Sequence, residues 1–142
     1  MIDPLSDINQ YGKNLTIAQA VKFFEKKGLK ISRAMIQNYI RDGLLPPPAG
    51  KRIYTRGHLA ALVVIDRLKT VFEMNEIKAA ILPHLDGEGM PLDFYYGLLD
   101  SLSKIEIESS VIDEAFRGEN GLLVLMLRAA ELKQIAVSKL NI

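Results

Sequence analysis

The residues best suited to chemistry are polar side chains that recur at helical spacing within residues 32–43. At about 100° per residue, one side of a helix here carries the basic and amide residues and one alanine: Arg33, Ala34, Gln37, Asn38 and Arg41. The opposite side carries the large apolar residues: Met35, Ile36, Tyr39 and Ile40. Because guanidinium and amide groups hydrogen-bond to bases and phosphates, the pattern predicts a helix that packs by one face and binds a polyanion by the other.

Local signals place another helix directly before this one. Thr16, with Gln19 three residues later, forms a capping box that predicts a helix over residues 15–27. Gly28 supplies a left-handed stop, and Ser32 can cap the following helix. The short connection predicts a helix-turn-helix rather than two independent helices.

A short extended segment is expected after the second helix. Each proline at positions 46–48 lacks an amide hydrogen and pushes the preceding residue toward extended geometry. Residues 49–50 offer a turn, after which polar and apolar residues alternate. We therefore expect a small β-hairpin, or wing, over residues 46–54, with Lys51 and Arg52 at a cationic tip.

Two more helices are expected after the wing. Thr55 can cap a third helix that runs to about Thr70, and its scarcity of polar residues predicts a central position. Asn75 is the expected cap of a short fourth helix. Residues 86–89 are too few for a calcium loop of the twelve-residue type and are interpreted as a flexible turn.

The rear part of the chain is also predicted to be helical. Pro91 suits a first helical position, and a helix over residues 91–103 is expected, with continuation to Phe116 favoured over a strand because no turn signal intervenes. The last segment, residues 122–140, has apolar residues at heptad-like spacing: Leu122, Leu125, Ala129, Leu132 and Ala136. Six further residues are interpreted as core rather than as the lining of a small-molecule pocket: Met90, Phe94, Tyr95, Tyr96, Phe116 and Met126.

Charge is unevenly distributed along the chain. Residues 1–82 hold thirteen Lys/Arg and seven Asp/Glu, a balance of +6, whereas residues 83–142 hold five and ten, a balance of −5. The basic front part is a candidate polyanion-binding surface, and solvated charge of no consequence is the alternative. The chain contains no cysteine, which excludes disulfides and thiolate sites.

The apolar runs and the first residues bear on location. The longest uninterrupted apolar run, from Leu122 to Leu127, is far shorter than the about 20 residues that a membrane span needs. Residues 1–7 have neither the basic start nor the apolar stretch of a secretory signal. We expect a cytoplasmic protein with no membrane partner.

The order of elements in the front part is itself a motif. It runs helix, tight turn, helix, Gly-Leu-Leu-Pro at residues 43–46, a short wing ending at residues 52–54, and a further helix pair. Over about residues 15–82 this order resembles the DNA-binding domain of MerR-type transcription regulators. Residues 38–48, with Leu-Val-Val-Ile at residues 62–65, look closer still to a MerR-related bacterial family catalogued only as a domain of unknown function. The resemblance implies a winged-helix fold, the second helix in the major groove, the wing along the phosphates, and dimers that read paired half-sites.

The resemblance also implies roles for single residues. Ser32 matches the cap of the recognition helix, Tyr39 the second aromatic of the family's tyrosine pair, and Tyr54 the residue that closes the wing. Tyr39 lies on the apolar arc, so we interpret it, like Tyr54, as a packing residue with a polar tip. Gln37 and Asn38 stand where the family usually has arginine and the first tyrosine, and the wing lacks the usual arginine soon after the proline. These departures predict altered or weaker DNA contacts, in which the two amides can pair with adenine while Arg33 and Arg41 can reach guanine or phosphate.

Catalytic and metal-binding chemistry has no candidate residues in this sequence. His58 and His84 are the only histidines, and neither has carboxylates at the spacing of a metal site, so both are expected to be structural. No phosphate loop, dinucleotide fingerprint or nucleophile elbow appears. We predict no enzyme activity, no metal and no cofactor.

Together these patterns predict a mainly α protein. A winged helix-turn-helix of MerR-like type with a small β-hairpin wing occupies residues 15–82, and a helical dimerisation or sensing region occupies residues 91–142. The predicted function is a sequence-specific transcription regulator that contacts double-stranded DNA through nine residues: Ser32, Arg33, Gln37, Asn38, Tyr39, Arg41, Lys51, Arg52 and Tyr54. A homodimer through the C-terminal helices is expected, while the operator, the direction of regulation and any small-molecule effector stay open. The alternative is a winged-helix protein-protein interaction module without DNA binding.

Overall fold

The computed structural model describes residues 3–11, 14–50, 52–104 and 118–139. Within these ranges the helices are α1 (Ile17–Lys26), α2 (Arg33–Arg41), α3 (Arg56–Leu68), α4 (Met74–Ile81), α5 (Leu92–Lys104) and α7 (Gly121–Ser138). The shorter elements are the 3-10 helices η1 (Ile8–Tyr11) and η2 (Leu82–His84) and the strands β1 (Asn14–Leu15) and β2 (Tyr54–Thr55). The prediction of a mainly α fold with a small antiparallel β element is confirmed.

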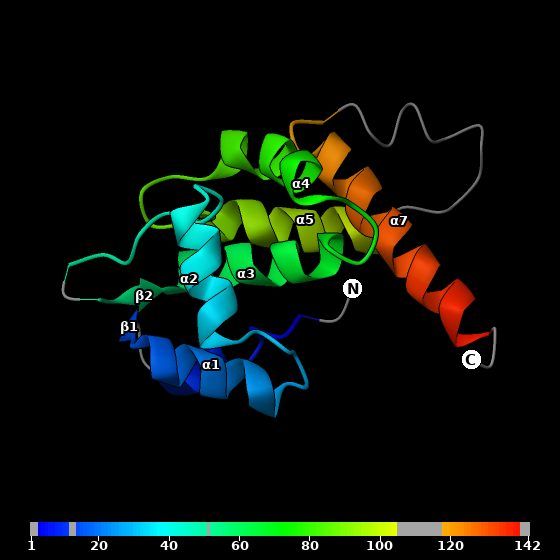
Figure 1. Ribbon diagram of the computed structural model, residues 1–142. Helices are drawn as coiled ribbons and strands as arrows, with labels where there is room; N and C mark the ends of the chain where they lie inside the picture. The colour runs from blue at the N-terminus through cyan, green and yellow to red at the C-terminus, as the bar shows by residue number, and fades with distance from the viewer. Residues whose placement is uncertain (1–2, 12–13, 51, 105–117, 140–142) are drawn as a thin grey trace.

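The first two helices begin and end close to their sequence signals. Thr16 and Gln19 form the predicted capping box, in which Gln19 N–H donates to Thr16 Oγ1 (3.2 Å) and Thr16 N–H donates to Gln19 Oε1 (2.9 Å). Ser32 caps α2 through its side chain. Gly28 after α1 has a φ of 75° and Gly43 after α2 a φ of 76°, a region that glycine enters without strain. As a result α2 follows α1 after a short turn and packs against it (Figure 1).

The segment after α2 differs in part from the predicted hairpin. Ala49 and Ile53 exchange two backbone hydrogen bonds of 2.8 and 2.9 Å, which close a tight antiparallel bridge. The next residue pairs elsewhere, because Tyr54 lies opposite Leu15 in the β1–β2 ladder. The predicted helix start at residue 15 was therefore two residues early. Pairing buries the side chains of both Leu15 and Tyr54, which explains why strand geometry is preferred there.

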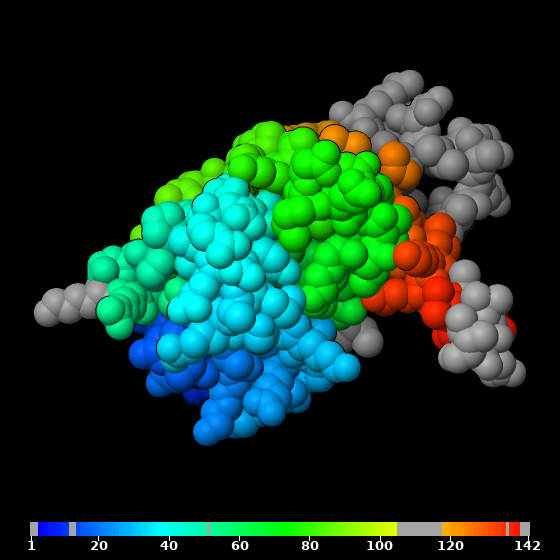
Figure 2. Space-filling model, in the orientation of Figure 1, coloured from blue at the N-terminus to red at the C-terminus, as the bar shows by residue number. Residues whose placement is uncertain are grey.

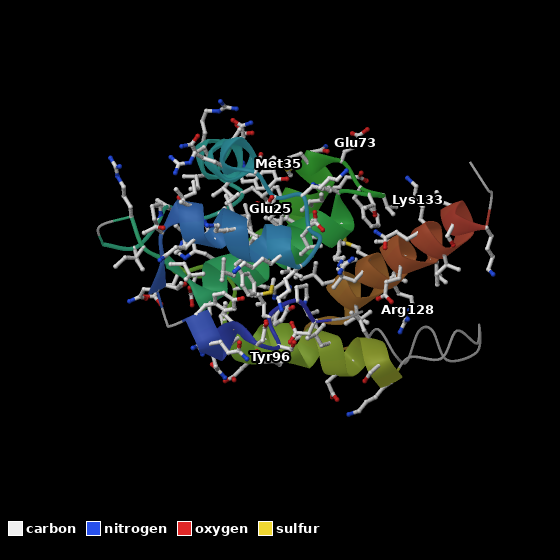
Figure 3. All side chains as sticks on the ribbon, turned by 90° about the horizontal axis from the view of Figure 1, so that it is seen from below. Glu25, Met35, Glu73, Tyr96, Arg128 and Lys133 are labelled. Atoms are coloured by element: carbon white, nitrogen blue, oxygen red, sulfur yellow. The ribbon has the colours of Figure 1, made fainter. Side chains whose placement is uncertain are left out.

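The central helix is α3, as its apolar composition predicted. Thr55 caps it, residues 58–65 are all buried, and it contacts β2, α5 and α7. Figure 3, seen from below, separates the layers, with α2 on one outer side and α5 on the other. On α7, Lys133 reaches back to the end of α3, where its Nζ donates to the Thr70 carbonyl (2.6 Å).

The boundaries of the later helices depart slightly from the predictions. Glu73 and not Asn75 is the N-cap of α4, because the Glu76 carboxylate accepts the Glu73 N–H (2.9 Å). Pro91 lies just before α5 rather than in its first turn, and its carbonyl accepts the Tyr95 N–H (3.0 Å). The favoured continuation of this helix to Phe116 lies outside the described residues.

One continuous hydrophobic core joins the front and rear parts of the chain. It extends from Leu5 and Ile8 through α3 to Leu127 on α7. The N-terminal segment is tied to α5 by Tyr95, whose hydroxyl donates to the Asp3 carboxylate (2.7 Å). Burial, together with that carboxylate, raises the pKa of Tyr95 far above its ordinary value. Within the described ranges, none of the helices combines the length and apolar character that a membrane crossing requires.

Candidate nucleic-acid interface

The two faces of α2 separate as their spacing predicted. Ile36 is fully buried, Tyr39 is 8 % exposed, and Met35 and Ile40 are half-buried. The opposite side, here called the outer face of α2, consists of exposed residues: Arg33, Ala34, Gln37, Asn38 and Arg41. In the view of Figure 2, α2 lies at the front of the molecule, and the described rear elements leave it uncovered.

Most side chains of the outer face form no hydrogen bond or ion pair within the described part of the chain. Arg33, Gln37 and Asn38 make no side-chain hydrogen bond or ion pair with any residue that the structure describes. Arg41 differs, because its Nε lies 3.4 Å from the carboxylate of Asp42. The outer face is therefore open for hydrogen bonding, and its positive charge is least compensated at Arg33.

The C-terminal end of α2 is held from α4. Lys78 Nζ donates to the carbonyl of Asp42 (2.8 Å), one of the carbonyls that a helix end leaves without an internal partner. A Cβ at Gly43 would lie only 3.3 Å from the same Nζ, so glycine leaves room for this contact. The lysine thus fixes where α2 ends relative to the rest of the fold.

Three of the nine predicted DNA-contacting residues have structural roles. Tyr39 and Tyr54 are only 8 % and 4 % exposed, and burial raises the pKa of both hydroxyls. Their rings pack in the core, as their interpretation as packing residues predicted. Ser32 uses its hydroxyl to accept the Met35 N–H (3.1 Å) and cap α2.

Of the two basic residues predicted at the tip of the wing, the structure describes Arg52. Arg52 is exposed and has a φ of 62°, an uncommon left-handed conformation for a residue with a side chain. Together with Gly50 it bends the chain so that Ala49 and Ile53 can pair. The loop extends from the body beside α2 (Figure 1). Lys51 lies outside the described residues.

A buried histidine anchors this loop to α3. His58 is fully buried, its Nδ1 accepts the Thr55 N–H (3.1 Å), and its Nε2 lies 3.0 Å from the Pro47 carbonyl. Since Nδ1 must offer a lone pair, the ring proton is on Nε2 and donates to Pro47. Burial lowers the pKa of His58 and favours the neutral ring that this arrangement needs. We call this set of contacts the His58 joint.

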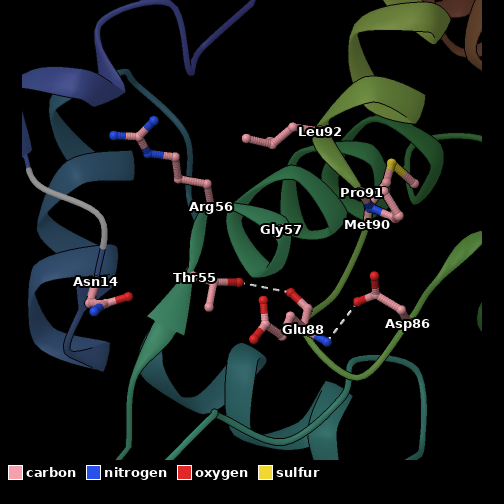
Figure 4. A pocket seen from close by; sticks show the side chains of 9 residues that line it. All are labelled: Asn14, Thr55, Arg56, Gly57, Asp86, Glu88, Met90, Pro91 and Leu92. Atoms are coloured by element: carbon pink, nitrogen blue, oxygen red, sulfur yellow. Dashed lines mark hydrogen bonds between the residues drawn. The ribbon is translucent and has the colours of Figure 1, made fainter.

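The turn at residues 86–89 packs against the start of α3. The sequence predicted a turn here, but it did not predict that the turn is held by contacts to another helix. Thr55 Oγ1 donates to the Glu88 carbonyl at 2.8 Å (Figure 4). A Cβ at Gly57 would lie 2.5 Å from that carbonyl oxygen, and a Cβ at Gly89 would lie 2.4 Å from the backbone of Gly57. Only glycine at both positions permits this backbone crossing.

An open pocket borders the same turn. Its lining is Asn14, Thr55, Arg56, Gly57, Asp86, Glu88, Met90, Pro91 and Leu92 (Figure 4). The guanidinium of Arg56 points away from the carboxylates of Asp86 and Glu88, so the charged groups do not converge on one point. No three His, Asp or Glu residues of the described chain gather in the way that a metal site requires. The described lining residues therefore do not form a metal-binding set.

The interpretation of the six rear residues as core is confirmed for three of them and is wrong for Tyr96. Met90 and Tyr95 are fully buried, and Met126 is 8 % exposed, so these three belong to the core. Phe94 stacks on His84 with ring centroids 4.4 Å apart, and Tyr96 is exposed on α5 (Figure 3). Phe116 lies outside the described residues.

Two residues of the interface were missed from sequence. Lys78 is far from α2 in the chain, and no local signal points to its contact. His58 had a usable signal, because Thr55-Arg56-Gly57-His58 has the spacing of a capping box with histidine in place of the usual Glu or Gln.

Comparison with known proteins identifies a family but no activity. Residues 5–95 match the family described as "Domain of unknown function (DUF1836)". No curated protein and no solved structure matches the chain. The family match begins at Leu5 in the buried N-terminal segment and ends at Tyr95, and it includes α2 and the His58 joint. Since it covers well over half of the 142 residues, the chain belongs to this family.

Proposed function

We propose that this protein is a DNA-binding transcription regulator of MerR-like type, with residues 15–82 as a winged helix-turn-helix. In this proposal α2 enters the major groove, and the loop carrying Lys51 and Arg52 lies along the phosphates. The observation that carries it is the outer face of α2, which is exposed, bears two arginines and two amides, and leaves three of these four side chains without a hydrogen bond or ion pair in the described chain. An α-helix of this kind fits the major groove of B-DNA.

The proposal includes a homodimer through the C-terminal helix. Apolar residues of α7 face solvent at the heptad-like spacing: Leu122 is 61 % exposed, Leu125 43 % and Leu132 41 %. Adjacent residues on the other side of the helix, Leu123 and Leu127, are buried in the core. A second copy of the helix would cover the solvent-facing stripe, and a two-fold dimer would present two copies of α2 to paired half-sites.

Binding to random-sequence duplex DNA at low salt, measured by fluorescence anisotropy, tests the function. The triple variant Arg33→Ala, Gln37→Ala, Arg41→Ala should lose binding while keeping its circular-dichroism spectrum, because all three side chains are exposed. A matched control removes two cations and one amide elsewhere: Lys104, Gln134 and Lys139, all exposed. Its affinity should stay close to that of the unmodified protein.

Salt dependence adds a second criterion. Neutralising a few phosphates per half-site makes the affinity fall about tenfold or more between 50 and 200 mM salt. Equal binding by the triple variant and the control, or an affinity that does not respond to salt, would refute the proposal.

A protein-interaction module without DNA binding is the second candidate. The exposed apolar stripe on α7 favours it, since such a surface binds proteins as readily as it forms dimers. Absence of any duplex binding at low salt, together with recovery of one defined protein partner that a substitution in the stripe abolishes, would decide for this candidate.

A further inference from the structure

The outer face of α2 has a fixed order along the helix axis. Arg33, Gln37 and Arg41 are spaced by four residues, so they follow one another along one side of the helix. At a rise of about 1.5 Å per residue, neighbouring members of this row are roughly 6 Å apart along the axis. Ala34 lies beside Arg33 and Gln37 and presents a methyl group to the same side.

The two ends of this row differ in charge. Arg41 has the exposed carboxylate of Asp42 at 3.4 Å from its Nε, so one of its donors is engaged and its field is partly cancelled. Arg33 forms no ion pair or hydrogen bond with the described residues, and its one recorded electrostatic neighbour is the hydroxyl of Tyr54. The N-terminal half of the row, Arg33 and Gln37, therefore keeps its donors free for base edges, whereas Arg41 does not.

The side chains of that half match particular base edges. An arginine bonds bidentately to O6 and N7 of guanine, and a glutamine bonds bidentately to N6 and N7 of adenine. The methyl group of Ala34 suits the methyl group of thymine. Since Gln37 is exposed and unpartnered, no contact within the described chain competes with base pairing.

We propose that Arg33 and Gln37 are the base-reading residues, and that the half-site contains a guanine and an adenine within about two base pairs of each other. The limit follows because roughly 6 Å along the helix corresponds to at most about two steps of 3.4 Å along the duplex, and to fewer when the helix lies at an angle to the duplex axis. Arg41 attracts phosphates without reading sequence. This inference rests on the proposed DNA-binding function and adds the sequence class that the same face selects.

Selection from a library of randomised duplexes tests the assignment. The unmodified protein should enrich a motif with guanine and adenine within the stated separation. Gln37→Ala should lose about tenfold or more of the preference at the adenine position only, which is the range expected for one bidentate pair. Arg33→Lys keeps the charge but not the fork of donors, so it should lose preference at the guanine position while its salt dependence stays the same.

The matched comparison is Arg41→Ala on the same face. It should weaken binding to all duplexes alike, lower the salt dependence, and leave the enriched motif unchanged. A motif that changes with Arg41→Ala, or one that survives both Gln37→Ala and Arg33→Lys, overturns the inference while DNA binding stands. If the unmodified protein enriches no duplex and binds none at low salt, the proposed function itself fails, and the inference fails with it.

Discussion

Removing the imidazole of His58 should loosen the loop that carries Arg52 and destabilise the fold. In the His58 joint one ring nitrogen accepts the Thr55 N–H at 3.1 Å, and the other donates to the Pro47 carbonyl at 3.0 Å. His58→Ala removes both contacts and empties the space of a fully buried ring. His58→Gln is the matched variant, because glutamine is a usual capping-box residue at this position and its amide offers one acceptor and two donors.

The size of the effect follows from the contacts that are lost. Loss of the helix-cap partner costs about 1 kcal/mol, loss of the hydrogen bond to Pro47 about 1 kcal/mol, and the cavity about 1 kcal/mol or more. The free energy of unfolding of His58→Ala should therefore fall by about 3 kcal/mol, which lowers Tm by roughly 10 °C in a chain of this length. His58→Gln should stay within about 1 kcal/mol of the unmodified protein, since it can restore the cap.

The same joint makes stability depend on pH with a defined sign. Burial lowers the pKa of folded His58, against the opposing effects of the Pro47 and Pro46 carbonyls and of Glu88 and Asp86. The unfolded chain, with an ordinary histidine pKa of about 6.5, then binds more protons than the folded one over the interval between the two values. The stabilisation that depends on neutral His58 is therefore fully present above about pH 6.5 and is lost progressively as the pH falls below this value. Glutamine does not titrate, so His58→Gln should lack this component.

Urea unfolding of the three proteins between pH 5.5 and 8 provides the measurement. Subtracting the free energy of unfolding of His58→Gln from that of the unmodified protein cancels the titration of all other groups. As the pH falls, this difference should become less favourable to the unmodified protein. A difference that stays constant over this range would refute the buried neutral ring. If His58→Gln were as unstable as His58→Ala, the capping role would be wrong.

Two further substitutions test other contacts. Gly57→Ala places a Cβ 2.5 Å from the Glu88 carbonyl oxygen and should destabilise the protein by about 2–3 kcal/mol in chemical denaturation. The matched variant is Gly87→Ala, in the turn that contacts Gly57. Its Cβ meets nothing within 4 Å and should change stability by less than about 0.5 kcal/mol. Equal effects at the two glycines would contradict the close backbone crossing. Leu132→Glu should convert the proposed dimer to a monomer in sedimentation. Helicity should be retained, because Leu132 is 41 % exposed. Gln134→Glu, at another exposed position of α7, should leave the mass unchanged. An unchanged mass for Leu132→Glu would exclude α7 as the interface.

Features that depend on short stretches of sequence were predictable. The cap of α1 needs only Thr16 and Gln19, and the ends of α1 and α2 need only a glycine that tolerates positive φ. The division of α2 into a buried and an exposed face follows from helical period alone, since residues four apart share a side. The residues of the outer face of α2 could therefore be predicted from the sequence alone.

Features that join distant segments were not predictable in this way. Strand β1 exists because Leu15 meets Tyr54, and neither short stretch signals the other. Leu5 is buried in the core, and the N-terminal segment that carries it is held to α5 by the hydrogen bond from Tyr95 to Asp3. The docking of residues 86–89 likewise depends on two glycines that touch across the fold. In each case the stabilising partner lies at least thirty residues away, where local patterns carry no information.

The candidate interface shows the same division within a single site. Arg33 and Gln37 were identified from their spacing, but their unequal surroundings were not. The carboxylate of Asp42 is adjacent in sequence to Arg41, yet only the structure shows that it turns toward the guanidinium, while Lys78 from α4 holds the Asp42 carbonyl. In the proposed DNA complex, this asymmetry would separate reading of bases from attraction of phosphates along one helix.

The position of α3 links the two proposals, DNA binding and dimerisation, in one testable way. It packs against α7 and begins at the Thr55 cap of the His58 joint, so a dimer formed along α7 would hold two copies of α2 at a fixed separation. Half-sites of such dimers recur about one turn of DNA apart, or at multiples of it. In selected DNA, Leu132→Glu should therefore abolish the fixed spacing between half-sites but keep the base preference within each, because the outer face of α2 does not involve α7. Loss of the base preference as well would mean that α7 maintains the conformation of α2 itself, and the two parts of the chain could not then be assigned separate roles.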